Sequence, residues 1–312
     1  MVAHKEQAVF YGLLKAGIWG SVFDNCYIGG LKWNDIYQLA EEQSVVGLVA
    51  AGIDRIKEKK GIAIPQTIAL QFVGATLQIE QRNVAMNEYL ARLINELRRE
   101  GIYSLLVKGQ GVAQYYDKPL WRSCGDIDLF LSEENYEKAK LFLSPLATSI
   151  EPEAAFKKHI GLNIDGWLVE LHGKLSSGLS SRTDKELDSI QDDTFSGGNV
   201  RSCMINTTKV FMLSIENDIM YVFSHILDHF YKGGIGLRQI CDWARLIWSN
   251  YNSINIKMLN ARIKNMGLMS EWKAFGVFAV EYLGMPADTM PFYDGSRKWK
   301  KKAERINKFI LA

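Results

Sequence analysis

The segment Asp126–Leu131 limits the local fold more than any other feature of the chain. Asp126 and Asp128 alternate with apolar residues, beginning with Ile127. Successive side chains of a β-strand point to opposite faces of a sheet, so this alternation predicts a strand with one buried face. Both aspartates would then project together from the other face.

A helical region is predicted before this strand. Apolar residues recur at spacings of three and four from Gln7 to about Arg99. Gly101 is placed to end the last helix, because glycine readily adopts the conformation that closes a helix C-terminus. The pattern changes at Ile102–Val107, a short apolar run that predicts a buried strand. A different domain therefore begins near residue 100.

A hairpin is predicted after the aspartates. The runs Ile160–Ile164 and Trp167–Leu171 have strand character and flank Asp165-Gly166. This dipeptide is typical of a two-residue hairpin turn, so the two strands should pair antiparallel.

The remaining patterns complete a prediction of the fold class. Ser176–Gly198 is rich in Ser, Gly and Asp and is interpreted as a connecting loop, and helical periodicity returns from about Thr208. We expect an α/β protein of the α+β kind, with a small mixed sheet flanked by helical regions. The expected parts are an N-terminal helical region over residues 1–99, a core over 100–205 and a C-terminal helical domain over 206–312.

Charge and composition limit the classes of partner. The chain has 37 basic and 35 acidic side chains in 312 residues, a formal net charge of +2. No overall field favours nucleic acid or a membrane surface, so neither is an expected partner. The basic run Arg297–Lys302 is interpreted as a solvated surface. Four cysteines without a CxxC pair, no apolar leader and no stretch of about 18 apolar residues predict a cytoplasmic protein without a membrane span.

The two aspartates are candidate ligands for a divalent cation. Like charges on one strand face repel, and a partly buried pair must take up protons or bind cations. Glu170 would join the same face if the hairpin keeps its register. Ligands with only oxygen donors favour Mg²⁺, or Mn²⁺, with Asp126, Asp128 and Glu170 as metal ligands and catalytic groups. The alternative is that these acids are solvated on an exposed face.

A candidate phosphate-binding turn precedes the acids. The predicted strand ends at Val107, and Lys108, Gly109 and Gly111 follow at the start of a short helix. Backbone N–H groups at a helix N-terminus bind anions, and glycine lets a phosphate approach closely. Lys108, Gly109 and Arg122 are therefore predicted to bind phosphate; surface cations beside an ordinary turn are the alternative. Neither a dinucleotide fingerprint nor a P-loop is indicated.

The histidines carry weaker predictions. His172, His225 and His159 are candidate substrate contacts or proton-transfer groups, and hydrogen-bonded structural histidines are the alternative. His225 and His229 are four residues apart and share a helical face. No third ligand follows at a diagnostic spacing, so a face turned toward a cleft or a packed helix is favoured over a zinc site.

At these residues the sequence resembles the nucleotidyltransferase superfamily that includes DNA polymerase beta, most closely its branch of uncharacterised bacterial nucleotidyltransferases. The resemblance is carried by Lys108-Gly109 after a strand, Arg122 before the acids, Gly125–Leu129, and Glu170 followed by His172. It covers residues of about 100 to 175 and extends loosely over His225–Leu246. Gln110 departs from the small residue that the superfamily usually has there.

The resemblance implies a small mixed sheet, Mg²⁺ held by the acids, and transfer of a nucleoside monophosphate from a triphosphate, expected to be ATP. Pyrophosphate would be released, and the acceptor would be a hydroxyl or phosphate of an unidentified small molecule or protein. Arg238 is predicted to bind the nucleotide, with an ion pair to Asp242 as the alternative. A protein-modifying or phosphotransferase activity, and a non-catalytic nucleotide-binding or interaction protein, stay open as other functions.

Overall fold

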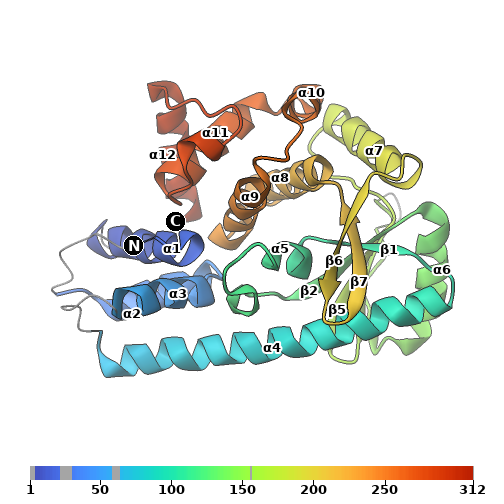
Figure 1. Ribbon diagram of the computed structural model, residues 1–312, viewed down its shortest axis with the longest axis horizontal. Coiled ribbons are helices and arrows are strands. Elements are labelled where there is room, and N and C mark those ends of the chain that lie inside the picture. The colour runs from blue at the N-terminus through green and yellow to red at the C-terminus, as the bar shows by residue number, and fades with distance from the viewer. Residues whose placement is uncertain (1–3, 22–29, 58–63, 155–156, 312) are drawn as a thin grey trace.

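The computed structural model describes residues 4–21, 30–57, 64–154 and 157–311. The first part of the chain is helical, as the apolar spacing predicts. It contains α1 (His4–Trp19), α2 (Trp33–Glu42), α3 (Val46–Lys57) and α4 (Gln66–Arg99). Figure 1 shows α4 running along one side of the molecule, from the other N-terminal helices to the sheet. This long helix therefore spans both halves of the protein.

A mixed seven-stranded sheet forms the centre of the described chain, in the order β3-β4-β5-β2-β1-β7-β6. Its strands are β1 (Ser104–Val107), β2 (Asp126–Leu131), β3 (Ser149–Ile150), β4 (His159–Ile164), β5 (Trp167–His172), β6 (Val200–Ile205) and β7 (Thr208–Leu213). β2 pairs antiparallel with β1 and parallel with β5. The α+β class and the strands predicted around residues 102–107, 126–131 and 160–171 are confirmed.

The predicted hairpin turn joins β4 to β5. Asp165 and Gly166 have φ values of 52° and 80°, and two successive positive φ angles are what the right-handed twist of a two-residue hairpin favours. Ile164 pairs with Trp167 directly across this turn, and the ladder continues to His159 and His172. The turn thereby fixes which side chains of the two strands share a face.

The sheet separates two hydrophobic cores. On one face, Ile127, Leu129 and Leu131 pack with the C-terminal half of α4 and with α6 (Glu133–Leu143). On the other, Val107 and Phe130 join the core formed by the N- and C-terminal helices. Asp126 and Asp128 share a face with Phe130, because β-strand side chains alternate. The two acids therefore face the C-terminal helices.

Two sequence-based expectations are wrong. The segment interpreted as the loop Ser176–Gly198 contains α7 (Ser181–Phe195), and β7 occupies the residues from Thr208 where helical periodicity was expected to resume. Because β7 pairs with β1, the sheet extends beyond the boundary expected at residue 205. The C-terminal helices begin at Ile215.

The C-terminal part packs on the N-terminal helices. It consists of α8 (Ile215–Lys232), α9 (Leu237–Asn250), α10 (Ile256–Met266), α11 (Met269–Glu281) and α12 (Arg297–Ile310). Figure 1 shows the chain end beside α1. Gln43 donates a hydrogen bond to the Ile310 carbonyl at 3.0 Å, and Tyr11 is bonded to Asn307. The two helical regions thus share one hydrophobic core.

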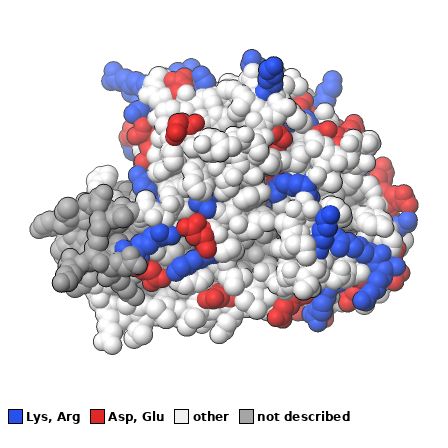
Figure 2. Space-filling model, in the orientation of Figure 1, with Lys and Arg blue, Asp and Glu red and all other residues white. Residues whose placement is uncertain are grey.

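The molecular surface is mixed in charge. On the face drawn in Figure 2, groups of basic side chains have acidic side chains beside them, in keeping with the formal charge of +2. The basic run Arg297–Lys302 begins α12, and its aromatic residue, Trp299, is 8% exposed and donates to Asp294. None of the described helices has the length and apolar character needed to cross a membrane.

Candidate functional site

The site lies where β1 ends beside the start of β2. Val107 pairs with Asp128, so the residue that follows β1, Lys108, is brought next to the acidic start of β2. Glu170 lies directly opposite Asp128 on the parallel strand β5. Opposed residues of neighbouring strands project to the same face. Glu170 therefore lies on the same sheet face as Asp128, as the sequence predicts.

Asp128 is the most buried of the three acids, at 2% exposure. Its Oδ1 atom lies 2.6 Å from Lys108 Nζ and 2.8 Å from His172 Nε2. Burial alone would lower the pKa of Lys108, but the Asp128 carboxylate outweighs this effect and raises it. Lys108 therefore stays protonated, and the Asp128 carboxyl group lies between two nitrogen groups.

Asp126 has a different environment. Among the described residues, no hydrogen bond or ion pair reaches its carboxylate. Burial and the nearby negative charge of Asp128 raise the pKa of Asp126, because both disfavour its charged form. A carboxylate that is partly buried without a donor is suited to receive a cation.

Glu170 lies between two histidines. Its Oε2 atom is 3.3 Å from His159 Nε2 and 3.5 Å from His172 Nε2. Burial would raise the pKa of Glu170, but these hydrogen bonds lower it overall, so the carboxyl is ionised. Burial opposes protonation of His172, yet its bonds to Asp128 and Glu170 raise its pKa. The face therefore carries alternating anionic and nitrogen groups.

The turn at Lys108-Gly109 has an unusual backbone. Lys108 has a φ of 56° and Gly109 a φ of 37°. Both lie in the positive-φ region, which residues other than glycine rarely adopt. A Cβ atom on Gly109 would also lie 3.3 Å from Cys124 Sγ. Strained backbone of this kind costs about 1–3 kcal/mol and persists where the surrounding structure holds it. Here it turns Lys108 toward Asp128 at the N-terminus of α5 (Gly109–Ala113).

Arg122 is paired within the protein. Its guanidinium binds Asp242 of α9, with 3.1 Å from Nε to Oδ1 and 2.5 Å from Nη2 to Oδ2. Tyr116 also donates to Asp242, at 2.9 Å. The sequence alternative that pairs Asp242 with Arg238 is wrong, because Arg238 instead donates to the Ser123 carbonyl at 3.0 Å. The Nε atom of Arg238 is buried without a partner in the described structure.

These residues line two cavities, of about 350 and about 50 Å³. The cavities share Lys108, Asp126, His225, Arg238 and Gln239. The larger adds Glu170 and His172, and the smaller adds Gly109, Arg122 and Asp128. Every residue that the sequence proposed for the site thus borders one or both cavities. Both lie between the sheet and the helices α8 and α9.

One wall of the larger cavity comes from α8. The residues are Tyr221, Ser224, His225, Asp228 and His229. Their spacing of three and four places them on one helical face, so a polar stripe on an otherwise apolar helix could have indicated this wall. Sequence reasoning identified His225 and His229, with Asp228 nearby, but not Tyr221 and Ser224. Lys157, Lys174 and Ser177 also line the cavity, and no sequence pattern singles them out.

The site residues form no single short sequence motif, but the chain as a whole matches a known protein family. A family model described as uncharacterised nucleotidyltransferase matches residues 29–284. The chain belongs to this family. The family match includes the sheet, the strained turn and the helices α8 and α9, so it covers the whole candidate site of this nucleotidyltransferase. No curated protein and no solved structure gives a significant match.

The three carboxylates have the donor chemistry that a hard divalent cation prefers. Asp126, Asp128 and Glu170 offer oxygen donors from one sheet face, which is the donor type that Mg²⁺ prefers. The Lys108 ammonium is already within 2.6 Å of Asp128. The site is therefore built to hold positive charge, and no hydrogen bond or ion pair among the described residues reaches the Asp126 carboxylate.

Proposed function

We propose that this protein transfers a nucleoside monophosphate from a nucleoside triphosphate, with ATP as the expected donor, to an acceptor hydroxyl or phosphate. The observation that carries this proposal is the gathering of Asp126, Asp128 and Glu170 with Lys108 and Arg238 around two cavities that share lining residues. Acids and cations in one place suit a metal-bound triphosphate. The superfamily of DNA polymerase beta, which the sequence resembles, is the expected wider relationship.

Asp126, Asp128 and Glu170 would hold Mg²⁺ or Mn²⁺, which neutralises phosphate charge and stabilises the leaving oxygen when bound. Glu170 is ionised and held by two histidines, so it would orient an acceptor hydroxyl and accept the proton that this group loses. The acceptor oxygen would form a bond to the α-phosphorus. The bond from that phosphorus to the bridging oxygen would break, and pyrophosphate would leave.

The phosphates would be bound by the strained turn and two arginines. The Lys108 ammonium contacts Asp128 beside the start of α5, and Arg238 has a buried Nε without a hydrogen-bond partner in the described part of the chain. Arg122 borders the smaller cavity while bound to Asp242. Such fixed cationic groups stabilise the charge that develops during phosphoryl transfer.

The acceptor would occupy the larger cavity. Its volume of about 350 Å³ and its polar wall on α8 suit a small polar molecule or a protein side chain. His225 and His172 would contact the acceptor there, because both line this cavity.

Labelled nucleotides test the proposal. The protein is incubated with α-labelled or γ-labelled ATP, or another triphosphate, with Mg²⁺ or Mn²⁺ and fractionated cell extract. We expect transfer of the α-label with pyrophosphate release, and loss of transfer in the Asp126→Ala/Asp128→Ala variant. Transfer of the γ-label instead would identify a phosphotransferase. Label found on a protein would identify a protein-modifying activity. Label incorporation that survives the double substitution would refute the metal site.

Thermal unfolding separates an enzyme from an inactive binding protein. A ligand at 100 times its dissociation constant stabilises a protein by about 2.7 kcal/mol. We expect a rise in the unfolding temperature that needs both nucleotide and Mg²⁺. A nucleotide-induced rise that is the same without metal, together with no label transfer, would favour the non-catalytic alternative.

A further inference from the structure

His159, Glu170 and His172 form a compact group on the sheet face beside the two aspartates. His159 lies directly opposite His172 in the antiparallel pair of β4 and β5. Glu170 precedes His172 by two residues on β5, so the three side chains share one face. The hairpin turn fixes this arrangement, because its register decides which residues are opposed.

The potential ligand atoms of the group are already close together. Glu170 Oε2 is 3.3 Å from His159 Nε2 and 3.5 Å from His172 Nε2, and the three ligand atoms lie within 4.8 Å of one another. A metal with tetrahedral bonds of about 2.0–2.1 Å has ligand atoms about 3.3 Å apart. Small side-chain rotations would therefore bring all three atoms to one ion.

The donor set differs from that of the aspartates. Two imidazoles and one carboxylate suit Zn²⁺, Co²⁺ or Mn²⁺, whereas Mg²⁺ is bound through oxygen. Within the described residues, this is the group of three His, Cys, Asp or Glu side chains whose ligand atoms converge sufficiently to hold an ion. All three residues line the larger cavity, so a fourth ligand could enter from the cavity.

We propose that His159, Glu170 and His172 form a second metal site, which binds a first-row transition-metal dication such as Zn²⁺, Co²⁺ or Mn²⁺ with an open position toward the acceptor cavity. The proposal that a metal binds here depends only on the positions of these three side chains. A role for the open position in holding the acceptor rests on the proposed nucleotide transfer. Glu170 would then belong to both sites and connect the acceptor side to the nucleotide side.

Cobalt is a suitable probe, because Co²⁺ replaces Zn²⁺ and has visible absorption that depends on its ligands. The full-length protein is freed of metal with a chelator and titrated with Co²⁺. We expect absorption bands of a nitrogen-ligated ion in the wild type. In His159→Gln we expect at least about ten-fold weaker Co²⁺ binding, because one ligand is lost.

A matched variant makes the test specific. His229→Gln removes a histidine from the same cavity, where its ring lies 4.3 Å from that of His225. It should leave Co²⁺ binding unchanged. Bands that persist in His159→Gln, or that disappear in His229→Gln, would overturn the assignment.

The result can be separated from that of the proposed function. Transfer of α-label with Mg²⁺ reports on the aspartates, and Co²⁺ absorption reports on the histidines. Absence of Co²⁺ binding in the wild type would refute the second site even if nucleotide transfer occurs. Co²⁺ binding that depends on His159 would support the site even if no transfer is found.

Discussion

Asp242 of α9 binds the Arg122 guanidinium through both carboxylate oxygens, and both side chains are buried. The pair connects a C-terminal helix to the segment that precedes the acidic strand β2. Arg122 also borders the smaller cavity. A carboxylate that binds one edge of a guanidinium fixes the direction of the other edge, so Asp242 positions Arg122 in the proposed phosphate site.

The first prediction concerns the stability of this pair. Asp242→Leu leaves the Arg122 charge buried without its partner, and loss of one member of a buried pair costs about 3–5 kcal/mol. We expect urea unfolding to show a decrease of this size in the free energy of unfolding. Adding Arg122→Met should restore much of the loss. Equal stability of the single and double variants would contradict the prediction.

An exposed ion pair provides the control for this measurement. Glu304 and Lys308 are four residues apart on α12 and are bonded at 2.7 Å, with side chains 53% and 71% exposed. Exposed pairs on a helix contribute about 0.3–0.5 kcal/mol. Glu304→Leu should therefore change the unfolding free energy by far less than Asp242→Leu.

Sequence reasoning could not find the partner of Asp242. Arg238 is four residues away, which favours a local pair on one helix. The observed partner, Arg122, is 120 positions away in the chain. Only the tertiary fold, in which α9 packs against α5 and α8, brings these two residues together. Long-range pairs of this kind carry no local periodicity and so leave no pattern in a single sequence.

The second prediction is that Lys108 competes with a divalent cation for Asp128. Its Nζ atom is 2.6 Å from Asp128 Oδ1. Lys108→Met keeps the length of the side chain but removes its charge. We expect Mg²⁺ or Mn²⁺ to bind the nucleotide-free variant about ten-fold more tightly, equivalent to about 1.4 kcal/mol, while ATP binds more weakly. Calorimetric titration measures both affinities.

Lys174→Met is the matched control, because Lys174 is exposed and lines only the larger cavity. It should change Mg²⁺ affinity little. If Lys108→Met instead weakens Mg²⁺ binding, the ammonium supports the metal site rather than competing with it.

The candidate site was predictable where local pattern determines geometry. The alternation through Asp126 and Asp128, together with the turn at Asp165-Gly166, predicted that all three acids lie on one face of the sheet. The same turn also implies that His159 opposes His172, because a two-residue hairpin fixes the whole register. The parallel pairing of β5 with β2 could not be read from the sequence, since it depends on a long connection.

The missed elements have weak local patterns. α7 buries only a narrow stripe, including Leu187 and Ile190, within a polar segment that is typical of a loop. β6 is an edge strand with exposed residues at every second position, and β7 is a short apolar run directly before a helix. Pairing with β6 and β1, rather than residue periodicity, establishes β7 as a strand.

The third prediction is a pH dependence that comes from His225. Burial lowers the pKa of His225 well below its ordinary value of 6.5, and the positive charge of Lys108 lowers it further. Below pH 6.5 the unfolded chain binds a proton that the folded protein does not. The free energy of unfolding should therefore fall as the pH decreases, by at most about 1.4 kcal/mol per pH unit.

Urea unfolding of wild type and His225→Gln at pH 7, 6 and 5 measures this contribution. The variant should lose less stability than the wild type between pH 6 and pH 5. His4→Gln controls for the loss of a histidine, because His4 is exposed at the start of α1. Parallel stability curves for the wild type and His225→Gln would show that the prediction is wrong.

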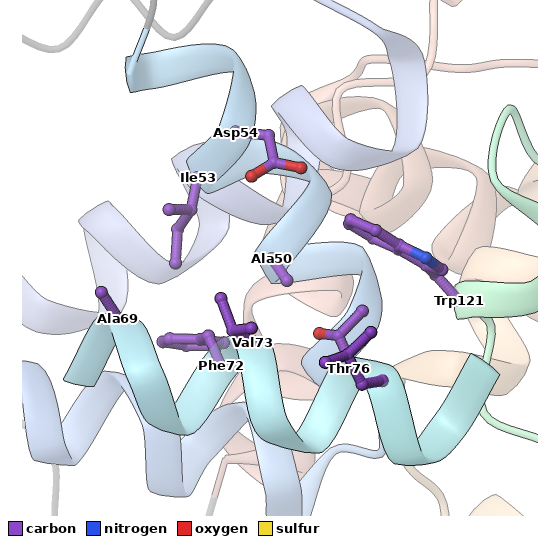
Figure 3. A pocket seen from close by; sticks show the side chains of 9 residues that line it. Ala50, Ile53, Asp54, Ala69, Phe72, Val73, Thr76 and Trp121 are labelled. Carbon is purple, nitrogen blue, oxygen red and sulfur yellow. The ribbon is translucent and has the colours of Figure 1, made fainter. Parts of the chain in front are cut away.

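The final prediction concerns a cavity of about 90 Å³ between α3 and α4 (Figure 3), which is lined mostly by apolar side chains such as Phe72 and Val73. Thr76 also lines it, and its Oγ1 atom is buried without a hydrogen-bond partner in the described structure. A buried polar group left unpaired costs about 1–3 kcal/mol. Thr76→Val keeps the shape of the side chain and should raise the free energy of unfolding by about 1 kcal/mol, measured in urea.

Thr194→Val is the control for this prediction, because Thr194 Oγ1 is satisfied and donates a hydrogen bond to the Ile190 carbonyl at 2.7 Å. That variant should be destabilised, and equal effects of the two substitutions would mean that the Thr76 hydroxyl is satisfied in solution.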